Sequence, residues 1–253
     1  MLRTRVIPVL LLDDEDLVKG EKFKKHKYVG DPINAVRIFN EKEVDELAFL
    51  DISATLRGRE PNYSMIEEMA SEAFMPMAYG GGVSDCGQVE KLFKCGVEKI
   101  VVNSAFYDNP NFIVQASKIA GSQSIVVSID VKKSLLGKWD VYSGSGSKKE
   151  RLDPVSAAIK AQELGAGELV ITAIDREGTN KGYDIPLVQK IVNAVDIPVI
   201  ANGGAATLND FNEASKIAGA SAVAAGRQFI FHGKHKAVLI TYPSYSELKE
   251  TFR

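Results

Sequence analysis

Two glycine clusters occupy matching positions in the two halves of the chain, and each could hold an oxyanion. Gly80-Gly81-Gly82 and Gly203-Gly204 each follow a short apolar run and precede an amphipathic segment. Glycine lets the backbone approach an anion closely, and the N–H groups at the start of the next helix can then hold a phosphate. Either cluster alone would equally suit a tight turn. Because the pattern occurs twice in register, we expect two phosphate-binding cradles.

A pair of small residues follows the next apolar run in each half. Asn103-Ser104 stands after one run, and Ala225-Gly226, with Arg227 behind it, stands at its counterpart. These residues would complete the two cradles. A repeat of half the chain length indicates two similar half-barrels, and their anion sites would lie on opposite sides of one opening.

Carboxylates stand at the ends of three other apolar runs, as Asp51, Asp130 and Asp175. A carboxylate there can transfer protons or orient substrate hydroxyl groups, and it can equally cap a helix. Asp130 directly ends the run IVVSI and is the candidate catalytic residue. Lys19, predicted in the loop after the first run, could reach a phosphate as a point charge or be a solvated surface lysine.

A charged residue begins four of the apolar runs, and the four alternate in sign along the chain: Arg5, Glu46, Lys99 and Glu168. In a closed barrel, these side chains would converge into a ring at the floor. From the residues alone, a structural salt-bridge cluster that seals the barrel is the favoured interpretation.

The elements that would position these residues are apolar runs alternating with amphipathic segments. The runs, predicted as strands, are Arg5–Leu12, Glu46–Ile52, Met75–Ala78, Lys99–Val102, Ser124–Asp130, Glu168–Ile174, Ile197–Ala201 and Ser221–Ala225. The segments, predicted as helices, are Pro32–Lys42, Met65–Ala73, Gln88–Lys94, Asn111–Ala120, Pro154–Leu164, Ile185–Val195 and Leu208–Ala218. This alternation predicts a parallel sheet. Eight runs in 253 residues predict an α/β protein with a single (β/α)8 TIM-barrel domain over residues 1–253.

Composition limits the partners and the setting. The net charge of −2 and the pI near 6.0 give no reason to expect nucleic acid or an anionic membrane as a partner. The apolar N-terminal run is too short to span a membrane, and two cysteines, Cys86 and Cys95, suit a reducing cytoplasm. His232 and His235 make a poor metal set, so no metal and no other cofactor is expected. The stretch Ser143–Arg151 is predicted to be a flexible loop.

Together these residues resemble the cyclase subunit of imidazole-glycerol-phosphate synthase, the HisF family, over essentially the whole chain. The carriers in the first half are RVIPVL at Arg5–Leu10, VKG at Val18–Gly20, GDP at Gly30–Pro32, DELAFLDI at Asp45–Ile52, GGG at Gly80–Gly82 and NSA at Asn103–Ala105. Those in the second half are GSQSIVVSID at Gly121–Asp130, ELGAGE at Glu163–Glu168, DREGT at Asp175–Thr179, KGYD at Lys181–Asp184 and IPVIANGG at Ile197–Gly204.

The resemblance implies a barrel that forms a heterodimer with a glutaminase. Ammonia from the glutaminase would enter through the floor and travel along the interior to the mouth. There it would react with a bis-phosphate ribulosyl intermediate, giving imidazole glycerol phosphate and an aminoimidazole nucleotide. The four charged floor residues match the family's ammonia gate, which favours a gate over a seal. The resemblance also places Gly178 and Thr179 in a phosphate site and makes Asp130 one of two catalytic aspartates.

The position of the other catalytic aspartate holds Leu11, which cannot move a proton, and losing a general acid/base costs roughly 10²–10⁴-fold in rate. The chain also resembles a divergent branch of the family linked to surface-polysaccharide clusters. The carriers are Met1–Leu12, Asn40–Leu47 and the tail Ala237–Ser244. That branch implies work with a glutaminase and a sugar amidotransferase, converting an N-acetyl group of a nucleotide-activated sugar into an acetamidino group.

Three hypotheses for the activity follow. The first is an ammonia-delivering synthase subunit in acetamidino-sugar formation. The second is a cyclase of histidine biosynthesis, and the third is a non-catalytic barrel that only conducts ammonia. An intact floor below an altered mouth favours the first, because ammonia delivery is still needed when imidazole cyclisation is not. The bulky cation of Arg227 beside Gly226 also predicts a remodelled second phosphate site.

Overall fold

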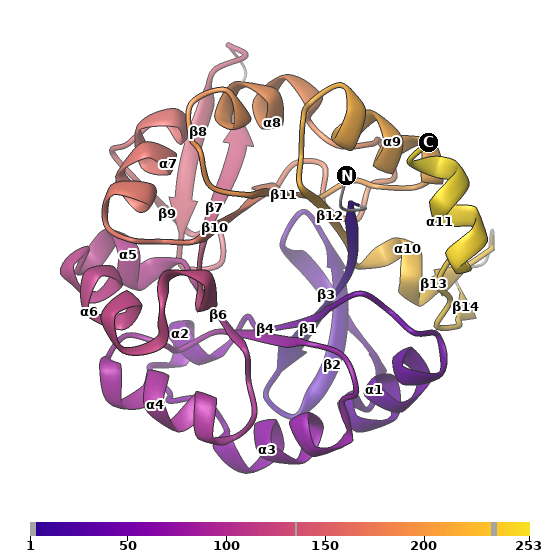
Figure 1. The fold of residues 1–253 in the computed structure, drawn as a ribbon, viewed down its shortest axis with the longest axis horizontal. Helices are drawn as coiled ribbons and strands as arrows, with labels where there is room; N and C mark the ends of the chain where they lie inside the picture. The colour runs from indigo at the N-terminus through magenta and orange to yellow at the C-terminus, as the bar shows by residue number, and fades with distance from the viewer. Residues whose placement is uncertain (1–3, 135, 234–236) are drawn as a thin grey trace.

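The computed structural model describes residues 4–134, 136–233 and 237–253, and in this part of the chain eight parallel strands close into a barrel (Figure 1). In order around the ring they are β1 (Arg5–Asp13), β4 (Leu47–Asp51), β5 (Met77–Gly80), β6 (Lys99–Val102), β7 (Ile125–Lys133), β10 (Glu168–Ala173), β11 (Val199–Asn202) and β12 (Ala222–Ala225). Each pairs in parallel with the next, and β12 pairs with β1 to close the ring. The predicted (β/α)8 TIM barrel is confirmed.

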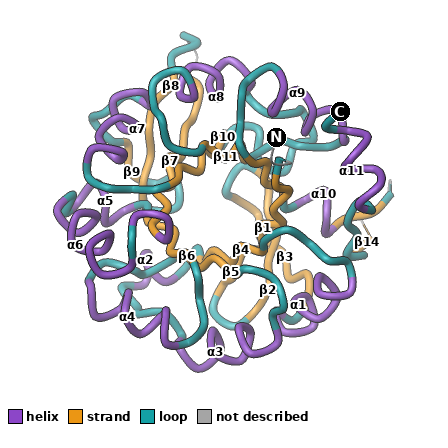
Figure 2. Tube along the Cα trace, in the orientation of Figure 1, coloured by secondary structure: helices purple, strands orange, loops and turns teal. Residues whose placement is uncertain are grey.

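A ring of helices surrounds the strands (Figure 2). They are α1 (Pro32–Glu41), α3 (Tyr63–Glu72), α4 (Cys86–Lys94), α6 (Asn111–Ala120), α7 (Pro154–Glu163), α8 (Ile185–Val192), α9 (Leu208–Lys216) and α11 (Tyr245–Thr251). Side-chain caps fix where most of them begin, although α6 has none. At α1, Asp31 accepts a hydrogen bond from the Asn34 N–H at 2.8 Å, with Pro32 at the first helical position. The helix α11 was not predicted, and it lies against α9.

Short elements build the rest of the structure, mostly at the mouth. The helices α2 (Ala54–Arg57), α5 (Ser104–Asp108) and α10 (Arg227–Ile230) follow β4, β6 and β12. A hairpin of β2 (Asp16–Glu21) and β3 (Lys24–Gly30) follows β1, and another of β8 (Trp139–Ser143) and β9 (Lys148–Lys149) follows β7. A 3-10 turn, Ser122–Ser124, precedes β7, and β13 (Phe231–His232) pairs with β14 (Ala237–Val238).

Three local predictions about these elements are wrong. Lys19 lies in β2 rather than in a loop, because this segment pairs with both β1 and β3. Ser143–Arg151 is a hairpin turn with β9 rather than a flexible loop, since the Ser147 N–H donates to Ser143 O at 3.1 Å and β9 pairs with β8. The first strand runs beyond Leu12 to Asp13, which pairs with Asp16.

Alternate side chains of each barrel strand enter two separate buried clusters. On β1, Val6 and Leu10 pack outward among the helices, whereas Ile7 and Val9 pack inside the barrel. The inner cluster is entirely apolar and contains four alanines: Ile7, Val9, Ala48, Ala78, Val101, Val126, Val170, Ile200, Ala222 and Ala224. These small side chains leave a narrow apolar interior between the floor and the mouth.

The two half-barrels carry the same turns at the same places. A glycine pair with positive φ follows the third strand of each half. The φ angles are 122° and 71° at Gly81 and Gly82 after β5, and 92° and 110° at Gly203 and Gly204 after β11. L side chains rarely adopt such angles, so glycine is required at these turns. The fourth strand of each half, β6 or β12, is followed by a short helix, α5 or α10.

Candidate active site

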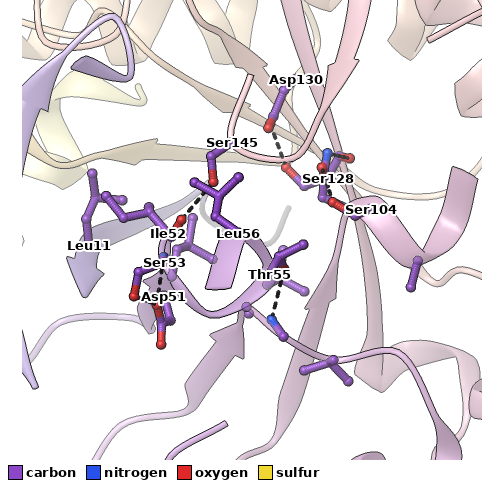
Figure 3. A pocket seen from close by; sticks show the side chains of 18 of the residues that line it. Leu11, Asp51, Ile52, Ser53, Thr55, Leu56, Ser104, Ser128, Asp130 and Ser145 are labelled. Carbon is purple, nitrogen blue, oxygen red and sulfur yellow. Dashed lines mark hydrogen bonds between the residues drawn. The ribbon is translucent and has the colours of Figure 1, made fainter. Parts of the chain in front are cut away.

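A cavity of about 660 Å³ opens at the carboxyl ends of the barrel strands (Figure 3). Two hairpins overhang it: Phe23 and His26 come from the β2–β3 hairpin, and Ser145 comes from the turn between β8 and β9. Ser145 Oγ donates to Ile52 O at 2.9 Å, which ties this turn to the segment after β4. The cavity has the size of ordinary small-molecule sites and lies where (β/α)8 enzymes hold their substrates.

Asp130 lies in the wall of this cavity, 7% exposed, and accepts a hydrogen bond from Ser128 Oγ at 3.0 Å. Burial raises the pKa of Asp130 to about 7, although hydrogen bonds from Ser128 and Thr172 offset part of the rise. Thr172 Oγ1 in turn accepts from Asn202 Nδ2 at 3.1 Å, so this polar wall continues onto β10 and β11. A carboxyl group with this pKa can accept and donate a proton near neutral pH.

Leu11 lies on the other side of the mouth. Its strand, β1, is four strands from β7 in either direction around the ring. Leu11 stands opposite Leu50 in register, and both side chains pack against the inner apolar cluster and line the cavity. Figure 3 shows Leu11 and Asp130 entering the pocket from different sides. The mouth therefore has an apolar wall facing an acidic one.

The predicted first-half cradle lines the cavity. Gly81, Gly82, Asn103 and Ser104 all contribute to its wall. Asn103 Nδ2 donates to the Ser128 carbonyl at 3.0 Å, which joins this cradle to the strand that carries Asp130. The Ser104 hydroxyl accepts from the Gly144 N–H at 3.1 Å, and the Gly82 N–H donates to Thr55 Oγ1 at 3.2 Å.

Two arginines that we did not single out from the sequence also line the cavity beside this cradle. Arg57 Nη2 lies 2.9 Å from Asp13 Oδ1, and Arg59 pairs with Asp14. The signal available in the sequence was RGRE at residues 57–60, shortly after the run that ends in Asp51. The two side chains are 50% and 37% exposed, and each guanidinium is paired with an aspartate at the rim of the cavity.

Asp51 also lines the cavity, but its carboxylate is engaged in a local turn. Asp51 Oδ1 accepts from the Ser53 N–H at 2.8 Å, from Ser53 Oγ at 2.8 Å and from the Ala54 N–H at 2.9 Å. These bonds position the start of α2, which is the capping alternative considered from the sequence.

The helices that follow the glycine clusters have their N-termini already capped. Asp85 precedes α4, and its side chain accepts from the Gln88 N–H while the Gln88 side chain accepts from the Asp85 N–H. Thr207 and Asp210 make the same reciprocal pair at the start of α9. At each of these helix ends a side chain of the chain itself already accepts from one N–H group that a phosphate would use, and phosphate binding there stays a prediction. The short helices α5 and α10 begin at the two pairs of small residues, Asn103-Ser104 and Ala225-Gly226.

The predicted second-half residues do not line the mouth cavity themselves, although Thr172, Glu177 and Asn202 of the same half do. Of the described residues that line the cavity, none belongs to this set: Asp175, Gly178, Thr179, Gly203, Gly204, Ala225 and Gly226. Thr179 Oγ1 donates to Arg176 O at 2.6 Å, and Asp175 Oδ1 accepts from the Lys133 N–H at 3.2 Å. The structure thus brings the first-half set to the cavity, whereas of the second-half set Gly226 lies against Lys19, a residue that lines it.

Lys19 is buried, 3% exposed, and forms an ion pair with Glu177, so it is no solvated surface lysine. Both residues line the cavity. The Lys19 ammonium lies close to the Gly226 backbone, because a Cβ at Gly226 would stand 2.4 Å from Lys19 Nζ. Glu177 was missed from the sequence, although it stands within the motif DREGT.

At the other end of the barrel, the four charged residues that begin strands form a closed ring of ion pairs. Lys99 Nζ lies 2.9 Å from Glu46 Oε2 and 2.9 Å from Glu168 Oε2, and the Arg5 guanidinium pairs with the same two carboxylates. Both glutamate side chains are 5% exposed. Burial acts to lower the pKa of Arg5, but the two carboxylates outweigh it and hold this pKa above its ordinary value.

The two cysteines singled out from the sequence belong to neither the mouth cavity nor the ring of floor ion pairs. Cys86 and Cys95 are free thiols, partly buried. His235 and Met1–Arg3 lie outside the described residues. Within residues 4–134, 136–233 and 237–253, no group of three or more His, Cys, Asp and Glu side chains is placed to hold a metal ion. In the same part of the chain, no helix has the length and apolar character needed to cross a membrane.

Comparison with known proteins places the chain in a family. Residues 5–236 match the model of the family described as histidine biosynthesis protein. The chain is 50% identical to "Putative imidazole glycerol phosphate synthase subunit hisF3" of Vibrio vulnificus, over 99% of this chain and 96% of that protein. It is 49% identical to the correspondingly named hisF2 protein of Pseudomonas aeruginosa, over 98% of this chain and 99% of that protein.

A further relative is "Imidazole glycerol phosphate synthase subunit HisF" of Petrotoga mobilis, 43% identical over 92% of this chain and 91% of that protein. The family model and these relatives each cover nearly all of the barrel described above. The chain is therefore a HisF-like member of the histidine biosynthesis protein family.

Proposed function

We propose that this chain is the ammonia-accepting synthase subunit of a glutamine amidotransferase complex. It takes ammonia from a HisH-like glutaminase at the barrel floor and delivers it to a phosphorylated substrate at the mouth. The acceptor that fits best is an N-acetyl group of a nucleotide-activated sugar, converted to an acetamidino group. The observation that carries this proposal is Leu11 facing Asp130 across the mouth, above an unbroken ring of floor ion pairs.

The interior between floor and mouth supports transport of ammonia in its neutral form. A small cavity of about 20 Å³ lies directly above Glu46, among the side chains of the inner apolar cluster. One water-sized molecule needs about 10–15 Å³. Burying a charged ammonium ion among apolar groups would cost far more than burying neutral ammonia. The floor ring would therefore separate a charged outside from an interior suited to NH₃.

Asp130 supports proton transfer at the mouth, and Leu11 opposite it does not. Asp130, with its pKa of about 7, can take the proton that ammonia loses when its nitrogen attacks an electrophilic carbon. Imidazole cyclisation in the family relies on two aspartates, and Leu11 stands where the other one is expected. In acetamidino formation the nitrogen replaces the carbonyl oxygen. A sugar amidotransferase partner would activate that oxygen by transferring a phosphoryl or nucleotidyl group to it from a nucleoside triphosphate, so that it departs as phosphate or as a nucleoside monophosphate.

The names of the relatives favour a second candidate, a genuine cyclase of histidine biosynthesis. An isotope experiment separates the two. The purified chain, its glutaminase and amide-¹⁵N glutamine are supplied with either an N-acetylated nucleotide sugar and its amidotransferase or the bis-phosphate ribulosyl intermediate. We expect ¹⁵N in the sugar and no imidazole glycerol phosphate.

Efficient conversion of the bis-phosphate, or rescue of a histidine auxotroph, would establish the cyclase and reject the sugar proposal. The third candidate, a barrel that only conducts ammonia, predicts that Asp130→Asn leaves nitrogen transfer unchanged. A large loss in that variant would reject it.

A further inference from the structure

We propose that His26 is a second proton acceptor at the mouth and contacts the acceptor substrate from the hairpin that follows β1. His26 was not singled out from the sequence. The inference rests on the proposed function and deepens it, because it assigns to the mouth a proton-transfer group that Leu11 does not supply.

The β2–β3 hairpin holds His26 at the mouth. Its two-residue turn consists of Lys22 and Phe23, which both have positive φ, at 54° and 60°. A turn of this kind matches the twist of two antiparallel strands and fixes their register. The Lys22 N–H donates to Glu177 O at 2.9 Å, which binds the tip of the hairpin to the loop after β10. The hairpin is therefore held at both ends, by β1 and by this loop.

The side chains of the hairpin divide between the cavity and the solvent. Phe23 and His26 line the cavity, whereas Lys24 and Lys27 are exposed. The half-buried His26 ring lies against Gly20 of β2, where a Cβ would stand 2.6 Å from His26 Cδ2 and 3.0 Å from His26 Nε2. A residue with a Cβ at position 20 would have to displace the ring. Gly20 thus leaves the space that the imidazole occupies.

The imidazole of His26 is free to accept a proton. Neither ring nitrogen has a hydrogen-bond partner within the described part of the chain. Burial lowers the pKa of His26 below its ordinary value of 6.5, Asp13 at the end of β1 opposes this change, and Lys19 on β2 adds to it. Both neighbours are themselves paired, Lys19 with Glu177 and Asp13 with Arg57. The ring is therefore uncharged at neutral pH and has a free lone pair.

His26 and Asp130 line one cavity from different elements. Asp130 belongs to β7, whereas His26 belongs to the hairpin that follows β1, four strands away around the ring. A substrate that fills the cavity would contact both side chains. The hairpin thus gives the mouth a second group that titrates near neutral pH, which is the range in which acid–base catalysis is most effective.

Acetamidino formation releases two protons from the attacking nitrogen, since the neutral group keeps one of the three hydrogens of ammonia. As the nitrogen bonds to the activated acetyl carbon, it loses a first proton, to Asp130. The electron pair of a second N–H bond then forms the carbon–nitrogen double bond, and His26 takes the proton. The carbon–oxygen bond breaks at the same time, and the oxygen leaves with its electron pair as phosphate or as a nucleoside monophosphate.

The test compares ¹⁵N transfer by the wild-type chain and by His26→Gln across pH, with the glutaminase and the amidotransferase in excess. Because both chains share these partners, the ratio of the two rates reports on the barrel. We expect the wild-type rate to exceed that of the variant by roughly 10²-fold at pH 8. Below the pKa of His26 the ratio should shrink by up to about tenfold per pH unit, because the protonated ring can no longer accept a proton.

A ratio near one at every pH would overturn the inference. A larger ratio that does not change with pH would also overturn it, because it would mean that His26 only shapes the hairpin. Lys27→Gln is the matched control, since Lys27 lies exposed on the same strand and does not line the cavity. It should leave the rate and its pH dependence unchanged.

His26→Ala provides an independent measurement, because the shortened side chain leaves room for imidazole from solution. We expect added imidazole to restore part of the lost rate in a saturable way and to leave Lys27→Gln unaffected. A dispersed amide spectrum shows that the variant is folded. Imidazole that fails to restore transfer in the folded His26→Ala chain would contradict the inference.

Failure of the inference and failure of the proposed function give different results. A wild-type chain that transfers no nitrogen to the sugar would reject the proposed function, and the role of His26 with it. Transfer to the sugar that His26→Gln leaves unchanged would reject the role of His26 alone.

Discussion

Leu11 on β1 and Asp130 on β7 face each other across the mouth of the barrel, since their strands are separated by four positions in either direction around the ring. One wall of the mouth is therefore apolar, and the other carries a buried carboxyl group with a pKa of about 7. At the position opposite Asp130, the mouth therefore has an apolar side chain that cannot transfer a proton.

Asp130→Asn should lower nitrogen transfer by roughly 10²–10⁴-fold, because the amide keeps the shape of the side chain but cannot accept a proton. The measurement is the rate of ¹⁵N transfer with the glutaminase present. A matched control is Ser128→Ala, which removes the 3.0 Å bond to Asp130 and should raise the pKa of Asp130 further while keeping the carboxyl group. Its rate should fall less, with the pH profile displaced upward. Unchanged transfer in Asp130→Asn would mean that the barrel only conducts ammonia.

Asp130 should also make stability depend on pH. Its pKa of about 7 in the folded chain lies above the ordinary value of 3.8, so between these two pH values the folded state holds a proton that the unfolded state has lost. The free energy of unfolding should then fall as pH rises from about 4 to about 7, by up to roughly 4 kcal/mol, and level off above. Asp130→Asn should lack this component. Urea denaturation of both proteins at pH 5 and pH 8 measures it, and parallel changes in the two would contradict the assignment.

The sequence predicted the barrel and its floor better than its mouth. The barrel strands could be predicted because their continuous Val- and Ile-rich runs are visible in the local sequence. The floor could be predicted because a charged residue begins four of these runs, and Arg5 and Glu168 do pair there. The pairing of Lys19 with Glu177 joins positions 158 residues apart through a hairpin that the run pattern did not show. The sequence also gave no sign that Gly81 and Gly82 line the cavity whereas Gly203 and Gly204 do not, because that depends on tertiary contacts.

Lys99→Met should uncouple the glutaminase from the mouth. It removes two of the four floor ion pairs and leaves Glu46 and Glu168 with Arg5 as their remaining partner in the ring. Truncating one partner of a buried pair costs about 3–5 kcal/mol, so the melting temperature should fall as well. Glutamine-dependent transfer should drop relative to transfer from added ammonium salt. Thr4→Ala, which alters only the 2.7 Å contact with Ser215, is the matched floor control and should leave this ratio unchanged. Equal losses with both nitrogen sources would show that the ring does not govern passage.

Leu11→Asp should show whether the missing carboxylate alone prevents imidazole cyclisation. The new side chain would face Asp130, and if the absent aspartate alone prevents imidazole cyclisation, the variant should convert the bis-phosphate ribulosyl intermediate with a normal KM. We expect instead only a small gain in kcat, because Leu50 beside position 11 keeps this wall of the mouth apolar. Leu11→Asn is the matched control, since its amide is polar but cannot transfer a proton. Efficient turnover with a normal KM in Leu11→Asp would show that Leu11 is the main departure from a cyclase.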